Sequence, residues 1–398
     1  MKYIAITFAH GNGPYVRTVN WAIELNNIRE EKNLSRIPIV VPLIYPDSQE
    51  EILRREINFT NPGLIERNPQ EILFDIGYGG LLSLLMFKGK DYSENLEFLA
   101  KEYFGVESKI RNHLDGKRRV KTFKGTDLEI DLRDAELQLG LNNRVQTYLP
   151  NQFYTAGGAG PFDELLQRAI VDSEIKLNKK PMKKVLPIAR RMMENQRIIF
   201  SNEPGVFSYD PNRKLLNNEV HTPPFVYPLL KDETELPEKG IYLRGTGIKG
   251  INESAIYDSV LKLGFGLFVS EFEMKSFPER IRERIITILD PSKMNNPNII
   301  AVYGRAGWSS VWFSHLAEKP FLTPEYQKKD DPEMLFNERG IEKLGIGAII
   351  RNDPKFSLEK AKDLSGKVSG YNNSLKKRFG TLDGIRYCAE IVAKEMNY

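Results

Sequence analysis

Short runs of consecutive apolar residues recur along the chain, and glycine-containing turns follow several of them. The first run, Tyr3–Phe8, precedes the turn His10–Pro14, and apolar spacing then predicts a helix from about residue 16 to residue 27. Two prolines bracket the next strand, which is centred on Ile39–Val41. A strand, a glycine turn, a helix and a second strand form a βαβ unit, the building block of parallel sheets.

The same alternation continues to the end of the chain. Further strands are predicted at residues 197–200, 241–244, 267–269, 299–303 and 321–324, and further helices at 47–56, 91–104, 255–261, 308–318, from 334 and from 381. The charged stretch 109–147 has no clear periodicity, so we assign no element there. Prolines and dense charge between residues 225 and 240 indicate a linker.

Alternating strands and helices on both sides of a linker indicate an α/β protein with two doubly wound Rossmann-like domains facing a cleft. The chain has 398 residues, a length that favours two domains of ordinary size over one. We expect a first domain over residues 1–230, a second over 238–380, and a C-terminal helix over 381–398.

Composition narrows the class of protein. Hydrophobic residues make up 41% and charged residues 28% of the chain, as in a globular protein with an ample core, and the formal net charge is only +4. The single cysteine, Cys388, excludes an intrachain disulfide, and with four histidines a zinc site is not expected. The apolar start is too short for a signal peptide, and Leu81–Phe87 is shorter than the roughly 20 residues that span a bilayer. We expect a soluble or peripheral protein in the cytoplasm.

The stretch 303–347 carries most of the information about chemistry. Its first strand runs through Gly307 into a helix that opens with Ser309 and Ser310. Unpaired backbone N–H groups and the helix dipole make such an N-terminus a site for anions such as phosphate. The turn Gly245–Gly247 also follows a predicted strand, at the edge where ligands bind in open α/β sheets. The alternative is that these glycines only make tight turns.

This stretch resembles the donor-binding part of GT-B glycosyltransferases, in particular the peptidoglycan lipid-intermediate N-acetylglucosaminyltransferase and the UDP-glycosyltransferases. The family pattern runs from an arginine and a glycine through a Ser/Thr-bearing helix to two prolines around a strand, an asparagine at a helix start and a closing glycine. The matching residues are Arg305, Ala306, Gly307, Ser310, Pro320, Pro324, Asn337 and Leu344–Gly347. So many matches in order are far more specific than a lone glycine motif.

The resemblance implies a metal-independent transfer from a nucleotide-sugar donor, with inversion at the anomeric carbon and without a cofactor, and a last helix that packs back on the first domain. It places the donor against Gly245, Thr246, Gly247, Arg305, Gly307, Ser309, Ser310, Asp331, Glu333 and Asn337. Two positions depart from the pattern. Met334 stands where relatives often carry an amide, and Phe313 stands where they often carry a ribose-binding glutamate. The second departure leaves the nucleotide base open.

The N-terminal turn resembles the glycine loop that lies near the acceptor in this family, and some relatives read Gly-x-Gly-His-x-x-Arg there. The acceptor-side loop is then Gly11, Asn12 and Gly13, followed by a matching Arg17. Pro14 replaces the histidine of the pattern, and His10 precedes the loop.

An inverting transfer needs a base whose pKa lies near the working pH, which suits histidine. We therefore expect His10 to be the catalytic base, with Glu203 as a second candidate. Two other functions stay open. Nucleotide-sugar 2-epimerases share the fold and need carboxylates such as Asp331 and Glu333 around the sugar, and Phe313 and Pro14 are also compatible with a non-catalytic donor-binding subunit that needs a partner.

Two basic stretches, 117–121 and 179–191, lie in the first domain. Basic residues among Leu, Ile and Met are compatible with peripheral contact to anionic lipids at the inner face of the membrane, and a solvated charged face is the alternative. No aromatic-basic motif points to nucleic acid. The expected partners are a nucleotide-sugar donor and a lipid-linked or small-molecule acceptor.

Overall fold

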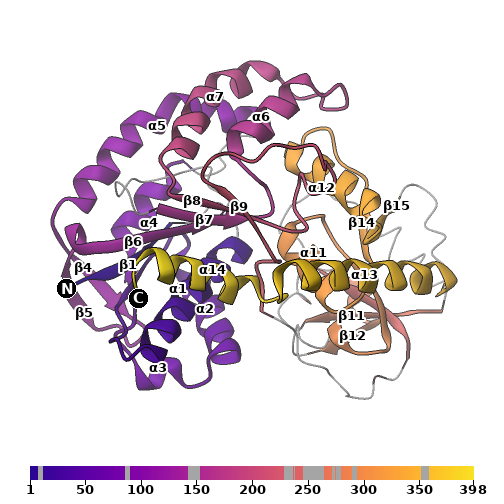
Figure 1. The fold of residues 1–398 in the computed structure, drawn as a ribbon, viewed down its shortest axis with the longest axis horizontal. Coiled ribbons are helices and arrows are strands. Elements are labelled where there is room, and N and C mark those ends of the chain that lie inside the picture. The colour runs from indigo at the N-terminus through magenta and orange to yellow at the C-terminus, as the bar shows by residue number, and fades with distance from the viewer. Residues whose placement is uncertain are drawn as a thin grey trace.

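The computed structural model describes residues 1–7, 12–85, 90–141, 153–227, 236, 238–244, 264–270, 274, 279–288, 294–350 and 358–398. Within these residues the chain forms two sheets, each flanked by helices, and the two assemblies lie side by side along the long axis of the molecule (Figure 1). His10, Gly11, the turn Gly245–Gly247 and the predicted helix 255–261 lie outside the described residues.

The first sheet has the strand order β5-β4-β3-β2-β1-β6-β7-β8-β9. Its strands are β1 (Tyr3–Ile6), β2 (Ile39–Pro42), β3 (Ile72–Asp75), β4 (Lys117–Thr122), β5 (Asp127–Asp131), β6 (Ala135–Leu141), β7 (Phe153–Gly157), β8 (Ile198–Asn202) and β9 (Glu219–Thr222). From β3 to β9 all neighbours pair in parallel, and β4 and β5 add an antiparallel hairpin at one edge. Strands β1, β2, β3 and β7 are buried along their whole length, because helices cover both faces of the sheet.

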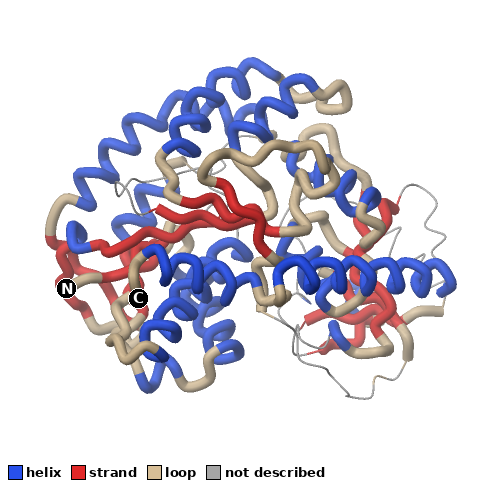
Figure 2. The backbone as a smooth tube through the Cα atoms, in the orientation of Figure 1, coloured by secondary structure: helices blue, strands red, loops and turns tan. Residues whose placement is uncertain are grey.

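Helices of the first domain form two layers around this sheet. They are α1 (Asn12–Glu31), α2 (Pro46–Thr60), α3 (Leu64–Arg67), α4 (Ile76–Ser83), α5 (Tyr92–Leu114), η1 (Leu132–Asp134), α6 (Phe162–Val171) and α7 (Lys179–Glu194). Helices α5, α6 and α7 pack together above the sheet in Figure 2, and α1 and α2 lie below it. In α7, Met182, Val185 and Met192 recur at helical spacing and are buried, whereas Lys183 and Lys184 are exposed.

The second sheet is parallel throughout, with the order β12-β11-β10-β13-β14-β15. Its elements are β10 (Gly240–Leu243), β11 (Gly266–Ser270), α10 (Glu279–Arg282), β12 (Ile285–Ile288), β13 (Ile299–Tyr303), α11 (Trp308–Leu316), β14 (Phe321–Pro324), α12 (Pro332–Lys343) and β15 (Gly347–Ile350). Chain order reverses between β10 and β13. The predicted α/β fold with two doubly wound sheets is therefore confirmed.

The last two helices, α13 (Leu358–Phe379) and α14 (Gly384–Glu395), run from the second domain back to the first (Figure 1). On α13, the Asn372 carboxamide oxygen lies 2.6 Å from His315 Nδ1 of α11. Helix α14 packs on α1, where Arg386 hydrogen-bonds Glu24 at 2.9 Å. The C-terminal helices therefore tie the two domains together.

The basic stretch 117–121 forms β4, the inner strand of the edge hairpin. The register places Arg119 opposite Glu129. Lys121 lies opposite Asp127, and the ammonium group of Lys117 lies 3.2 Å from the Glu129 carboxylate. These acidic neighbours partly neutralise the basic stretch, and Val120 packs in a buried cluster with Ile130 and Leu132. Contact of this stretch with anionic lipid stays a prediction.

Candidate functional site

The second sheet reverses its strand order between β10 and β13, and open α/β sheets bind ligands at such a switch point. Arg244 directly follows β10, and its N–H donates to the Tyr303 carbonyl at 2.8 Å. A Cβ atom at Gly304 would lie only 2.8 Å from Cβ of Arg244, so a glycine is needed there. The two strand ends therefore approach closely at the place where a ligand is expected.

Helix α11 begins at this switch point. Gly307 is its N-cap, and the Gly307 carbonyl accepts hydrogen bonds from the N–H groups of Ser310 and Val311. Helix geometry leaves the N–H groups of Trp308 and Ser309 without an intrahelical acceptor. The first turn contains no acidic residue, so the positive end of the helix dipole is not neutralised locally.

The N-terminus of α1 meets the N-terminus of α11. A Cβ atom at Gly13 would lie 3.1 Å from Ser309 Oγ, and one helical turn further on Arg17 Cζ lies 4.3 Å from the Phe313 ring centroid. Both pairs are separated by four residues, so the two helices run in the same direction with their positive ends together. The first turn of α1 also lacks an acid. The structure thus brings Gly13, predicted on the acceptor side, next to Ser309, predicted on the donor side.

A neighbouring side of α11 packs against loops of the first domain. A Cβ atom at Gly158 would lie 2.4 Å from Cγ of Trp308, and Trp312 Nε1 donates to the Pro204 carbonyl at 2.7 Å. Both indole rings are buried. Helix α11 is therefore fixed between the two domains.

Arg305 is engaged in a two-point ion pair with Asp330. Its Nε and Nη2 atoms lie 2.9 and 2.5 Å from the two carboxylate oxygens. The guanidinium that we expected to bind phosphate is thus paired with a carboxylate from the loop before α12, and its contact with phosphate stays a prediction. Sequence reasoning missed Asp330, and only the run of acids at 330–333 hinted at it.

The other donor-side candidates cluster around the start of α12. Asp331 is the N-cap of this helix, and its carboxylate accepts from the Glu333 N–H at 3.0 Å. Asn337 is fully buried, and its amide donates to the Ala306 carbonyl at 2.6 Å. Glu333 Oε1 lies 3.4 Å from the same amide nitrogen. These contacts join α12 to the turn that precedes Gly307.

Glu203 lies at the end of the first sheet and is buried. Its carboxylate accepts two hydrogen bonds from Arg378 Nη1, at 2.8 and 3.0 Å, and lies 2.5 Å from His221 Nδ1. Arg378 belongs to α13, so this cluster joins the C-terminal helices to the first domain.

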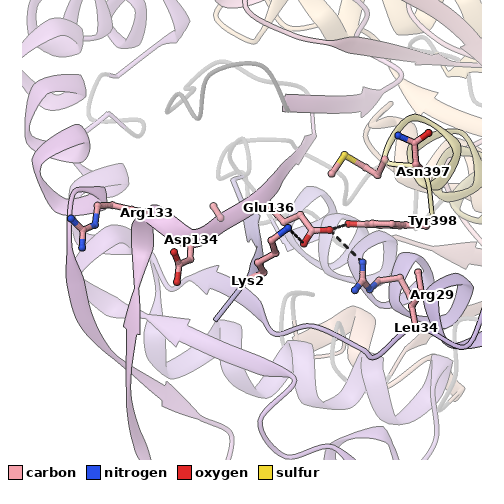
Figure 3. A pocket seen from close by; sticks show the side chains of 10 residues that line it. Lys2, Arg29, Leu34, Arg133, Asp134, Glu136, Asn397 and Tyr398 are labelled. Carbon is pink, nitrogen blue, oxygen red and sulfur yellow. Dashed lines mark hydrogen bonds and ion pairs between the residues drawn. The ribbon is translucent and has the colours of Figure 1, made fainter.

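A hollow of about 710 Å³ lies at the amino ends of β1 and β6 (Figure 3). Helix α1 starts at the other end of these strands. Glu136 forms its centre and contacts Lys2 at 3.5 Å, Arg29 at 3.3 Å and the Tyr398 hydroxyl. This hollow is separate from the switch point.

Across the described ranges, no group of three or more His, Cys, Asp or Glu side chains is arranged to hold a metal ion, and no helix is long and apolar enough to cross a membrane.

Comparison with known protein families finds no family that matches the chain, and comparison with curated proteins finds no similar sequence. Solved structures do match. The structure of UGT2 from Phytolacca americana, complexed with UDP-2-fluoro-glucose and pterostilbene, has a TM-score of 0.59 at 11% identity and covers 100% of both chains. The glycotransferase of kitacinnamycin has a TM-score of 0.56 at 10% identity, over 99% of this chain and 98% of its own. The glycosyltransferase SnogD from Streptomyces nogalater has a TM-score of 0.51 at 9% identity, over 100% and 99%. These likenesses show that the chain has the GT-B fold.

Proposed function

We propose that this protein is a glycosyltransferase that moves a sugar from a nucleotide-sugar donor to an acceptor hydroxyl. The observation that carries this proposal is the meeting of two helix N-termini, at Gly13 and Ser309, beside the switch point of the second sheet. The GT-B fold supports it, since one structure with this fold contains UDP-2-fluoro-glucose. The match of Arg305, Gly307, Ser310 and Asn337 to the donor-binding pattern of GT-B glycosyltransferases also supports it.

The donor diphosphate would bind at the N-terminus of α11, against Gly307, Ser309 and Ser310, and at the turn Gly245–Thr246–Gly247. Helix dipoles and backbone N–H groups stabilise charge that develops on a leaving diphosphate, so the transfer needs no metal ion. On the sugar side we place Asp331, Glu333 and Asn337, with Arg305 holding the loop before α12 in position through Asp330.

His10 is the base that we propose for the acceptor hydroxyl, next to the loop Gly11–Gly13. Direct attack on the anomeric carbon from the acceptor side gives inversion, and the proton moves from the acceptor oxygen to the imidazole as the bond to the diphosphate breaks. Glu203 is the second candidate that the sequence offers for this base. Because Arg378 and His221 hold its carboxylate, we assign Glu203 a structural role and test it below.

The decisive experiment changes Gly307, where a new side chain has room: the nearest atom to a Cβ there is the Arg305 carbonyl oxygen at 4.0 Å. Gly307→Asp adds a carboxylate at the proposed diphosphate position, and Gly307→Asn adds an uncharged cap of the same shape. Titration calorimetry with UDP, GDP, dTDP and ADP, in EDTA, measures the affinity of each protein.

We expect the tightest of these nucleotides to bind Gly307→Asp at least about tenfold more weakly than Gly307→Asn, a difference of about 1.4 kcal/mol. Both variants should be at least as stable as the wild type, because Asp and Asn are good N-caps. Equal nucleotide affinity of the two variants would show that the diphosphate does not bind at Gly307. No nucleotide binding by the wild type would contradict the proposed donor site as a whole.

For the acceptor we propose a lipid-linked or small hydroxyl compound, with the enzyme at the inner face of the cytoplasmic membrane. The exposed side of α7 carries Lys180, Lys183, Lys184 and Arg190 and supports electrostatic contact with anionic headgroups. Sedimentation with vesicles containing phosphatidylglycerol should retain the wild type, and replacing these four residues by Gln should release it. Retention by neutral vesicles alone would contradict this contact.

Sugar transfer measured with the purified chain tests whether a partner subunit is required. Turnover by the purified chain alone makes a partner unnecessary, whereas nucleotide binding without turnover favours one.

A further inference from the structure

Arg17 is a buried guanidinium group that forms no hydrogen bond with any residue in the described part of the chain. The residue is 6% exposed, and its Nε–H has no acceptor. The nearest carboxylate, that of Glu56, contacts Nη1 only at 3.8 Å. A guanidinium has five N–H donors, and buried donors are almost always satisfied in folded proteins. Among the described residues, the buried Nε–H of Arg17 therefore lacks an acceptor.

The side chain lies where the two domains meet. Arg17 is one turn after Gly13 on α1, and its guanidinium lies over Phe313, which is one turn after Ser309 on α11. Long side chains on helices lean toward the N-terminus of their helix. The guanidinium, over the Phe313 ring, therefore lies within about one helical turn of the joint of the two helix ends.

Positive charge accumulates at this joint. Arg244, at the end of β10, is close enough to Arg17 to lower the pKa of Arg17 further below its usual value, after burial as the main cause. Two helix N-termini that have no acid in their first turn add to this charge. The Glu56 carboxylate and, more weakly, the Tyr227 hydroxyl oppose it. An oxyanion between the helix ends would supply both the charge and the acceptor that the site lacks.

We propose that Arg17 is a positioning residue that donates hydrogen bonds to a phosphate-type oxyanion held between the N-termini of α1 and α11. This proposal rests on the glycosyltransferase function above. The source that we favour is the diphosphate of the donor, because Phe313 and Ser309 belong to the donor-side helix. Arg17 then links the acceptor domain to a bound donor, which holds the donor and the acceptor at a fixed position relative to each other.

Binding experiments separate this role from simple packing. Arg17→Gln removes the charge, Glu56→Gln removes the competing carboxylate, and Arg119→Gln, on the exposed face of β4, is a matched control. Each protein is titrated with the tightest nucleoside diphosphate, with the matching nucleoside, with inorganic pyrophosphate and with geranyl phosphate.

We expect Arg17→Gln to bind the nucleoside diphosphate and pyrophosphate about 10- to 100-fold more weakly, as for loss of a charge-assisted hydrogen bond, with little change for the nucleoside. Glu56→Gln should bind the diphosphate more tightly, and Arg119→Gln should match the wild type. A loss confined to geranyl phosphate would support the oxyanion and assign it to the acceptor. Unchanged binding of all anions by Arg17→Gln, in a wild type that binds nucleotide, would overturn this inference and leave the proposed function intact.

Thermal unfolding gives a second, independent readout. Because Arg17 is buried without a hydrogen bond, Arg17→Gln should leave the ligand-free melting temperature unchanged or raise it, while the increase on adding nucleoside diphosphate shrinks. A lower ligand-free melting temperature with an unchanged increase would make Arg17 a packing residue only. No increase for the wild type with any nucleotide would overturn both this inference and the proposed function.

Discussion

The indole ring of Trp308 fills the space that a side chain at Gly158 would need, since a Cβ atom there lies 2.4 Å from Trp308 Cγ. Gly158 follows β7 in the first domain, and Trp308 opens α11 in the second. The ring is 3% exposed and stacks with Trp312 at a centroid distance of 6.4 Å. The position of α11 between the domains therefore depends on this glycine and this tryptophan.

The first prediction follows directly. Gly158→Ala forces Trp308 to move, and we expect a loss of about 1–3 kcal/mol in the free energy of unfolding, as for overpacked cores. Urea denaturation followed by tryptophan fluorescence measures it. Gly105→Ala is the control, because no atom lies within 4 Å of a Cβ at Gly105 inside α5, and it should stabilise by up to about 1 kcal/mol. Equal stability of Gly158→Ala and the wild type would show that Trp308 has room to move.

The pair of Arg305 and Asp330 gives the second prediction. Both side chains are about one-fifth exposed, at 22% and 21%, and their two-point geometry is favourable. We expect Arg305→Gln and Asp330→Asn each to lower the free energy of unfolding by about 1 kcal/mol, and the double variant to lose no more than either. The measurement is a double-mutant cycle by urea denaturation. If instead Arg305→Gln weakens nucleotide binding and Asp330→Asn strengthens it, Arg305 is a phosphate ligand.

Glu203 supplies the third prediction. Glu203→Gln keeps the shape and removes the charge that holds Arg378, so we expect a loss of about 1–2 kcal/mol in stability with an unchanged kcat. Arg378→Gln should behave in the same way, and the two changes together should not add. A catalytic base would show a different pattern, namely a fall in kcat of about 100-fold or more in Glu203→Gln, absent from Arg378→Gln.

Much of the second domain could be predicted from sequence because its signals are local. The apolar runs of β10, β13 and β14 are consecutive, and the strand-to-helix turn that ends at Gly307 is marked by its glycines. Helix α12 begins at Pro332, two residues before the predicted start, because Asp331 caps it. These features need no information from distant parts of the chain.

The unassigned stretch 109–147 contains β4, β5 and β6. In β4, exposed Lys117, Arg119 and Lys121 alternate with other residues, and the strand is held by pairing with β3 and β5 and by burial of Val120 against Ile130. Helix α13 was not predicted either. Its stabilising contacts, such as the one between Asn372 and His315, join residues far apart in the sequence.

The same limit applies to the candidate site. The sequence pointed to Gly13 and Ser309 separately, but only the folded chain places them in contact and stacks Arg17 on Phe313. The sequence shows that Gly13 and Arg17, like Ser309 and Phe313, are four residues apart and so share one face of a helix. It does not show that these two faces pack against each other.

The fourth prediction concerns pH. Asp383 is the N-cap of α14, and its carboxylate accepts from the Arg386 N–H at 2.9 Å. Burial, together with the charge of Glu24, raises the pKa of Asp383 to about 6. The folded state therefore holds a proton that the unfolded chain releases at lower pH. The resulting stabilisation is complete below the usual pKa of 3.8 and is lost as pH rises through about 6.

Asp383→Asn keeps the cap and carries no charge, so we expect it to be more stable than the wild type at pH 7.5 and to lose this advantage at pH 4. Urea denaturation at the two pH values gives the comparison. Asp383→Ala removes the cap itself and should be less stable than Asp383→Asn by about 1 kcal/mol at both pH values. A wild type more stable than Asp383→Asn at pH 7.5 would mean that the ionised carboxylate strengthens α14, through Arg386 and the helix dipole, more than burial penalises it.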